Sequence, residues 1–194
     1  MRWLSAFLGI ITGAVLIAGD AAAHVEGGVA GGFAGGFAHP LTGPDHFLAM
    51  FAVGIWGAQM GGRSVWTLPV AFPLIMAAGG VAGMAGLPLP GFETGIAVSV
   101  LVLGLAIALV WRPREPAPLA LIAVFAVFHG YAHGVELPSA ADPAAYAVGF
   151  VIATGLIHVA GIFVGLALSK PMRGRLARGL GGLIAAGGVY FLVA

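Results

Sequence analysis

Two short stretches of this 194-residue sequence place ionisable side chains inside otherwise apolar segments. Together they carry four imidazoles and two carboxylates, which are His39, Asp45, His46, His129, His133 and Glu136. Imidazole combined with some carboxylate suits divalent first-row cations such as zinc, copper, iron, nickel and cobalt. The spacing of these residues predicts a metal-binding role but selects none of these ions.

The second stretch has the spacing of a helical row of ligands. His129 and His133 are four residues apart and therefore lie on one helix face, with Glu136 three residues further along the same stripe. With a rise of 1.5 Å per residue, His133 lies about 4–5 Å and His129 about 10 Å beyond Glu136. Two imidazoles one turn apart can share a divalent cation.

The first stretch predicts an interrupted helix. His39 and His46 are two turns apart, and Pro40–Pro44 contains two prolines and a glycine. Such a segment is kinked or broken, and the sequence leaves open which. A break frees backbone carbonyls, and many transporters build their substrate sites at such points. Asp45 is either a direct ligand or the partner that orients an imidazole.

The composition indicates that these residues lie in a membrane protein. The chain is 60% hydrophobic and 8% charged, whereas soluble domains are about 25% charged. The mean hydropathy is +1.07. We therefore expect an all-α, polytopic membrane helix bundle. A net charge of +1 without a basic run argues against nucleic-acid binding, and the absence of cysteine excludes thiolate metal sites. The 33 glycines predict closely packed helices.

Residues 1–23 have the pattern of a cleavable signal peptide. Arg2 precedes an apolar stretch, and Ala21–Ala23 supplies a small-residue cleavage site. The remainder, residues 24–194, is expected to form a single transmembrane domain. Its six predicted spans lie within 32–60, 65–87, 92–111, 118–135, 144–168 and 176–193.

The basic residues predict the orientation. If His24 begins outside the cytoplasm, the first, third and fifth spans end inside, and every basic residue of the mature chain follows one of them. These residues are Arg63, Arg112, Arg114, Lys170, Arg173, Arg175 and Arg178. The positive-inside rule then places both termini in the periplasm of a multi-pass inner-membrane protein.

Several functions remain open at this point. No P-loop motif is present, so transport would use a drive other than ATP. His46 and His129 could instead be axial ligands of a haem, or the protein could bind metal without transporting it. An enzyme is not expected, since the mid-span Ser99 lacks a nucleophile motif, and we expect Ser99→Ala to be neutral. The lone His158 suits a helix–helix hydrogen bond better than a ligand role.

Two runs of residues resemble the signatures of the HupE/UreJ family. They are residues 36–54, which include His39, Asp45 and His46, and residues 128–136, which read FHGYAHGVE. The resemblance implies a nickel permease, in some members a cobalt permease, that serves hydrogenase or urease maturation. It also implies that the six residues named above form the metal path. The expected partners are the transported divalent ion and the bilayer, with no resident cofactor. The ion, the metalloenzyme served and the oligomeric state are left open.

Overall fold

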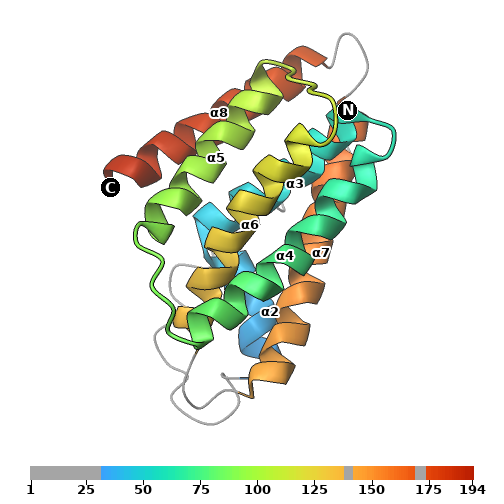
Figure 1. Ribbon diagram of the computed structural model, residues 1–194. Helices are drawn as coiled ribbons and strands as arrows, with labels where there is room; N and C mark the ends of the chain where they lie inside the picture. Colours follow the sequence, from blue (N-terminus) through green and yellow to red (C-terminus); the bar gives the residue numbers. More distant parts are fainter. Residues whose placement is uncertain (1–31, 138–141, 169–173) are drawn as a thin grey trace.

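The computed structural model describes residues 32–137, 142–168 and 174–194, and every regular element in these ranges is an α-helix (Figure 1). The predicted signal peptide and His24 lie outside the described residues. The helices are α2 (Phe33–Thr42), α3 (Pro44–Met60), α4 (Ser64–Met84), α5 (Phe92–Ala108), α6 (Ala117–Val135), α7 (Pro143–Ala167) and α8 (Gly174–Val193).

The helices coincide closely with the predicted spans. Helices α4 to α8 each match one span, whereas α2 and α3 share the first. Among the described residues, four helices are long and apolar enough to cross a membrane, namely α4, α6, α7 and α8. Helix α5 is a shorter apolar helix of 17 residues. The predicted all-helical class is confirmed for the described ranges. The count of six spans and the periplasmic termini stay predictions.

Helix α3 runs through the centre of the bundle. Every residue from Ala49 to Ala58 is buried, and α4, α5 and α7 pack around it. The side chains of Met50, Val53 and Trp56 have no exposed surface. A helix that is apolar on all sides belongs in the interior. The polar side chains of this segment are therefore confined to the ends of α3, and Asp45 and His46 lie at its beginning.

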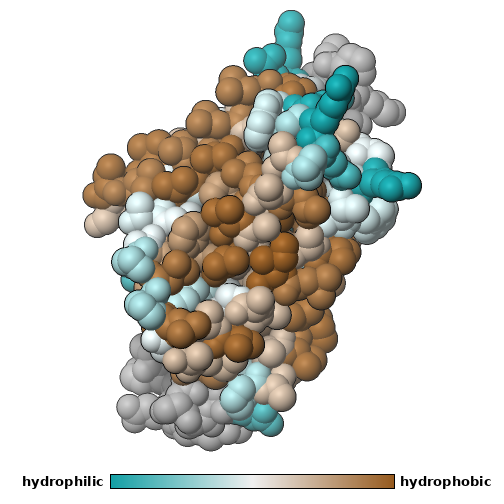
Figure 2. Space-filling model, in the orientation of Figure 1, coloured by the Kyte–Doolittle hydropathy of each residue, from teal (hydrophilic) through white to brown (hydrophobic). Residues whose placement is uncertain are grey.

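The outer surface is apolar along the length of the bundle and hydrophilic at its ends. Figure 2 shows a broad hydrophobic surface, with hydrophilic side chains gathered at the upper end. The exposed large hydrophobic side chains include Leu74, Phe163 and Leu183. A surface of this kind is stable against lipid, because hydrocarbon does not penalise exposed apolar groups. Together with the four long apolar helices, it identifies a membrane protein.

Glycines set the distance between α4 and α6, the helix that carries the second motif. Gly79 and Gly83 on α4 face Gly130 and Gly134 on α6. A Cβ atom added at any of the four would overlap a backbone carbonyl oxygen of the facing helix. Small residues four apart allow two helix backbones to approach closely. This contact fixes the position of α6 and of the histidines on it.

Side chains of neighbouring helices hold the end of α5. Trp56 and Gln59 from α3 and Arg178 from α8 donate hydrogen bonds to carbonyl groups within residues 107–111, at 2.9–3.0 Å. The last carbonyls of a helix have no partner inside the helix. The carbonyls of Ile107 and Ala108 belong to the last turn of α5, whereas that of Trp111 lies just beyond it. The three donors together dock the end of α5 between α3 and α8.

We predict that Gly79→Ala destabilises the protein while Gly155→Ala does not. Overpacking at Gly79 should lower the free energy of unfolding by about 1–3 kcal/mol. Each kcal/mol should lower Tm by about 2–4 °C. Gly155, on α7, has no atom of another described residue within 4 Å of an added Cβ, and alanine is the better helix former. Thermal unfolding in detergent, followed by tryptophan fluorescence, measures both. Equal Tm values for the two variants would contradict the packing described above.

Candidate metal centre

The first motif is broken at a single residue. Helix α2 ends at Thr42, α3 begins at Pro44, and Gly43 between them has an extended backbone. The Gly43 N–H donates to the His39 carbonyl at 3.1 Å, and the Gly43 carbonyl accepts from Phe47 at 2.8 Å. Pro40, by contrast, lies inside α2. The break turns the two helices so that both histidines of this motif approach α6.

Four imidazoles form a continuous row. The ring centroids of His39 and His133 are 4.8 Å apart, those of His133 and His46 are 4.6 Å apart, and those of His46 and His129 are 4.8 Å apart. The rings alternate between the two motifs, whose histidines are more than 80 residues apart in sequence. The two polar stretches therefore converge in the structure, as the sequence predicts.

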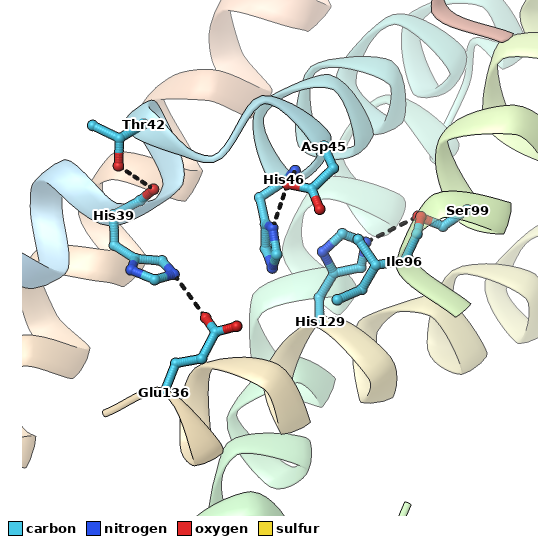
Figure 3. A network of polar contacts seen from close by, with 8 residues as sticks. All are labelled: His39, Thr42, Asp45, His46, Ile96, Ser99, His129 and Glu136. Carbon is cyan, nitrogen blue, oxygen red and sulfur yellow. Dashed lines mark hydrogen bonds and ion pairs between the residues drawn. The ribbon is translucent and has the colours of Figure 1, made fainter. Parts of the chain in front are cut away.

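The row leads from the surface into the interior. At the outer end, Glu136 Oε2 lies 3.3 Å from His39 Nε2, and these side chains are 44% and 31% exposed (Figure 3). Further along, His133 and His46 are buried, and His129 is completely inaccessible. A ligand that follows the row would lose its contact with water step by step.

Asp45 orients His46. Its Oδ1 atom lies 2.8 Å from His46 Nδ1 and also accepts the His46 backbone N–H at 2.8 Å. Of the two roles that the sequence left open for Asp45, this geometry supports the orienting one. With Nδ1 held in this way, the second ring nitrogen, Nε2, is buried and has no hydrogen-bond partner among the described residues.

Ser99, on α5, is a neighbour of the site that the sequence did not reveal. Its hydroxyl lies 2.9 Å from His129 Nε2 and donates to the Ile96 carbonyl at 2.6 Å. Both Ser99 and His129 have no exposed surface. Ser99 therefore contacts the site directly, a feature that the expectation of a neutral Ser99→Ala variant did not take into account. No local pattern marks its role, because the contact depends on how α5 packs against α6.

Several ring nitrogens of the inner imidazoles have no hydrogen-bond partner in the part of the chain that the structure describes. These buried atoms are His46 Nε2, His129 Nδ1, and both Nδ1 and Nε2 of His133. A buried polar group without a hydrogen bond typically costs about 1–3 kcal/mol. Nitrogen lone pairs of neutral imidazoles are the ligands that first-row divalent cations bind. The donor set therefore fits such a cation.

The outer end offers a second group of ligands. One atom from each of His39, His133 and Glu136 can be chosen so that all three lie within 4.8 Å of one another. His133 thus belongs both to this outer group and, through its contact with the His46 ring, to the inner row. A cation could pass from the outer group to the inner one without leaving the histidines.

A polar cleft of about 380 Å³ opens beside the row. Its lining includes Asp45, His46, Glu93 and Glu136, together with the end of α8. Three carboxylates around one opening create a negative potential that attracts cations. Glu93, in the first turn of α5, was not among the predicted site residues. Glu93 reaches the cleft because of the way α5 packs against its neighbours, and the same is true of the contact between Ser99 and His129.

The row ends at an aromatic ring. The ring centroid of Phe72 lies 5.4 Å from that of His129 and 5.6 Å from that of His158. His158 is almost completely buried on α7. It is the one histidine of the described residues that lies outside the row of four.

Comparison with known proteins extends the similarity beyond the two motifs. Residues 12–191 match the family described as HupE / UreJ protein. The chain is 44% identical over 157 residues to Protein HupE of Rhizobium leguminosarum bv. viciae, an alignment that covers 80% of this chain and 81% of that protein. No solved structure matches the chain. The resemblance predicted from residues 36–54 and 128–136 is confirmed.

We predict that Glu136→Gln weakens the binding of Co²⁺ to the purified protein about tenfold or more, because the variant removes the negative charge of the outer group. The matched control is Glu115→Gln. Glu115 accepts hydrogen bonds from Ser64 and Thr67 at the opposite end of the bundle, and its variant should bind as wild type does. Titration followed by the visible absorption of Co²⁺ measures both affinities. Wild-type affinity in Glu136→Gln would contradict a contribution of the Glu136 charge to binding.

Proposed function

The chain belongs to the HupE/UreJ family, and on this basis we propose that it is a secondary transporter of a divalent transition-metal cation. Ni²⁺ is the expected ion. The direction is uptake across the bacterial inner membrane, and the imported metal would supply the maturation of a hydrogenase or a urease. The proposal involves no catalysed covalent step.

The observation that carries this proposal is the row of four imidazoles. Successive ring centroids are 4.6–4.8 Å apart, and burial increases from His39 to His129. Conduction requires sites that replace the hydration shell of the ion yet release it to the next site. Neighbouring imidazoles at this spacing can share one cation during transfer. A single strong site would instead hold the ion in place.

The carboxylates give the row an entrance. Glu93 and Glu136 line the cleft, and Glu136 also contacts His39. A hydrated dication would be attracted there and exchange water for Glu136, His39 and His133. From His133 the next neighbour is His46, whose orientation Asp45 fixes.

The distribution of charge supports the direction of transport. The exposed arginines of the described residues lie at the α3–α4 turn, around the α5–α6 loop and at the start of α8. The imidazole row opens near the end of α6, at the other end of that helix from the α5–α6 loop. The positive-inside rule then directs the opening outward. The membrane potential would contribute about 4.6 kcal/mol per 100 mV to the inward movement of a dication, at about 2.3 kcal/mol per charge.

The geometry disfavours the haem alternative. A haem bound by His46 and His129 as paired axial ligands would need its porphyrin plane between the two rings. The ring centroids are 4.8 Å apart and the rings are nearly perpendicular, so they contact each other directly. A protein that binds metal without transporting it shares the same site, and measurement of flux separates it from a transporter.

We predict that His46→Ala and His129→Ala each reduce the initial rate of Ni²⁺ uptake into proteoliposomes at least tenfold, because each variant interrupts the row. Ser64→Ala is the matched control, since it removes a buried hydroxyl that bonds Glu115 far from the histidines. It should transport at the wild-type rate. Circular dichroism and gel filtration verify that all variants fold.

The same assay tests the choice of ion. With Ni²⁺ as the measured cargo, competition by Co²⁺ and by Zn²⁺ shows which of these ions the row of imidazoles accepts. Wild-type flux in both histidine variants would overturn the proposal. Binding of Ni²⁺ by a wild-type protein that shows no flux would favour the non-transporting alternative.

A further inference from the structure

The hydrogen bonds of Ser99 determine where the proton of His129 lies. A serine hydroxyl has one hydrogen to donate, and Ser99 donates it to the Ile96 carbonyl at 2.6 Å. Toward His129 Nε2, at 2.9 Å, the same oxygen can therefore only accept. With both contacts made as hydrogen bonds, the hydrogen of the second one comes from the histidine, which places a proton on Nε2 of His129.

The tautomer decides which nitrogen can bind a cation. An imidazole that ligates a metal must be neutral, with a hydrogen on one nitrogen and a lone pair on the other. With the hydrogen on Nε2, the lone pair of His129 lies on Nδ1. That atom is buried and has no hydrogen-bond partner among the described residues. In Figure 3, the Nε2 side of the ring faces Ser99 and the opposite side faces His46.

We propose that Ser99 is a positioning residue that holds His129 in the Nε2–H tautomer, so that this histidine binds the transported cation through Nδ1. The inference rests on the proposed function, because it names how one residue of that path is prepared for the ion. It also assigns a role to a side chain of α5, outside both histidine motifs.

The contact with His46 makes the arrangement reciprocal. Asp45 holds Nδ1 of His46, and Ser99 holds Nε2 of His129. Among the described side chains and backbone, neither His46 Nε2 nor His129 Nδ1 has a partner. Each ring is thus held by a hydrogen bond to one of its nitrogens, and its other nitrogen is available to bind a cation. Hydrogen bonds of this kind fix the orientation of metal-binding histidines, and their loss typically costs 10–100-fold in affinity or activity.

A structural role for Ser99 alone does not explain the second hydrogen bond. Serine hydroxyls inside helices commonly donate to a carbonyl one turn earlier, and the bond to Ile96 is of that kind. The bond to His129 joins two different helices, and both residues have no exposed surface. The opposite tautomer would place the lone pair of Nε2 against the lone pairs of the Ser99 oxygen, with no hydrogen between them.

The direct test is the tautomer itself. Nitrogen-15 NMR of the full-length, histidine-labelled protein in micelles, without metal, distinguishes the two forms by their chemical shifts. Comparison with His129→Gln assigns the signal. We expect Nε2 to be the protonated nitrogen of His129 and Nδ1 the unprotonated one. The reverse pattern would overturn the inference, and this readout needs neither transport nor a folded Ser99 variant.

The functional test compares three hydroxyl variants by isothermal titration with Ni²⁺. Ser99→Ala should weaken binding 10–100-fold, Ser99→Thr should restore it because the hydroxyl is retained, and Ser64→Ala should bind as wild type does. Wild-type affinity in Ser99→Ala would overturn the inference and leave the proposed function intact. A wild-type protein that binds no Ni²⁺ would instead overturn the proposed function, and with it the assignment of Nδ1 as a ligand.

Discussion

The central constraint on this structure is the burial of imidazole nitrogens that have no hydrogen-bond partner within the described ranges. A polar atom without a hydrogen bond is unfavourable in any protein interior, and more so where the surroundings are lipid rather than water. His46, His129 and His133 nevertheless keep four such nitrogens in the interior. A fold that maintains this arrangement must hold the rings rigidly, since small movements would allow them to find other partners.

Backbone contacts between helices provide that rigidity. The glycines of α4 and α6 let these two helices approach so closely that carbonyl oxygens of one helix occupy the space that Cβ atoms of the other would need. Gly54 and Gly161 form a similar contact between α3 and α7. The break at Gly43 then directs α2 and α3 toward α6 from one side. Helices α3 and α6, which carry three of the four histidines, are thus positioned by glycines at which an added Cβ would overlap the facing backbone.

Much of this architecture follows from local sequence. The helix positions were predictable because each apolar run is long and ends at glycine, proline or charged residues. The order of burial from Glu136 through His133 to His129 follows from their spacing on one helix face. The convergence of the two motifs was predictable from their similar depth in the bundle, although the alternation of the rings was not. Whether residues 40–44 form a kink or a break required the structure, because prolines permit both.

Residues of α5 mark the limit of the sequence-based prediction. Ser99 and Glu93 both approach the site from this helix, yet neither lies in a motif or near a histidine in the sequence. Their roles depend on the packing of α5 against α3 and α6, and on the hydrogen bonds that dock its end. A single serine in an apolar helix has the same local pattern whether it faces lipid or a histidine. Only tertiary packing distinguishes the two cases.

The most direct test of the central claim is X-ray absorption spectroscopy of the wild-type protein loaded with one equivalent of Ni²⁺. The account predicts a first shell of nitrogen and oxygen atoms with the multiple-scattering pattern of at least two imidazoles. The His46→Ala variant should lose part of that pattern. A spectrum of fully hydrated Ni²⁺, without imidazole scattering in the wild-type protein, would contradict the claim that the buried row binds the ion.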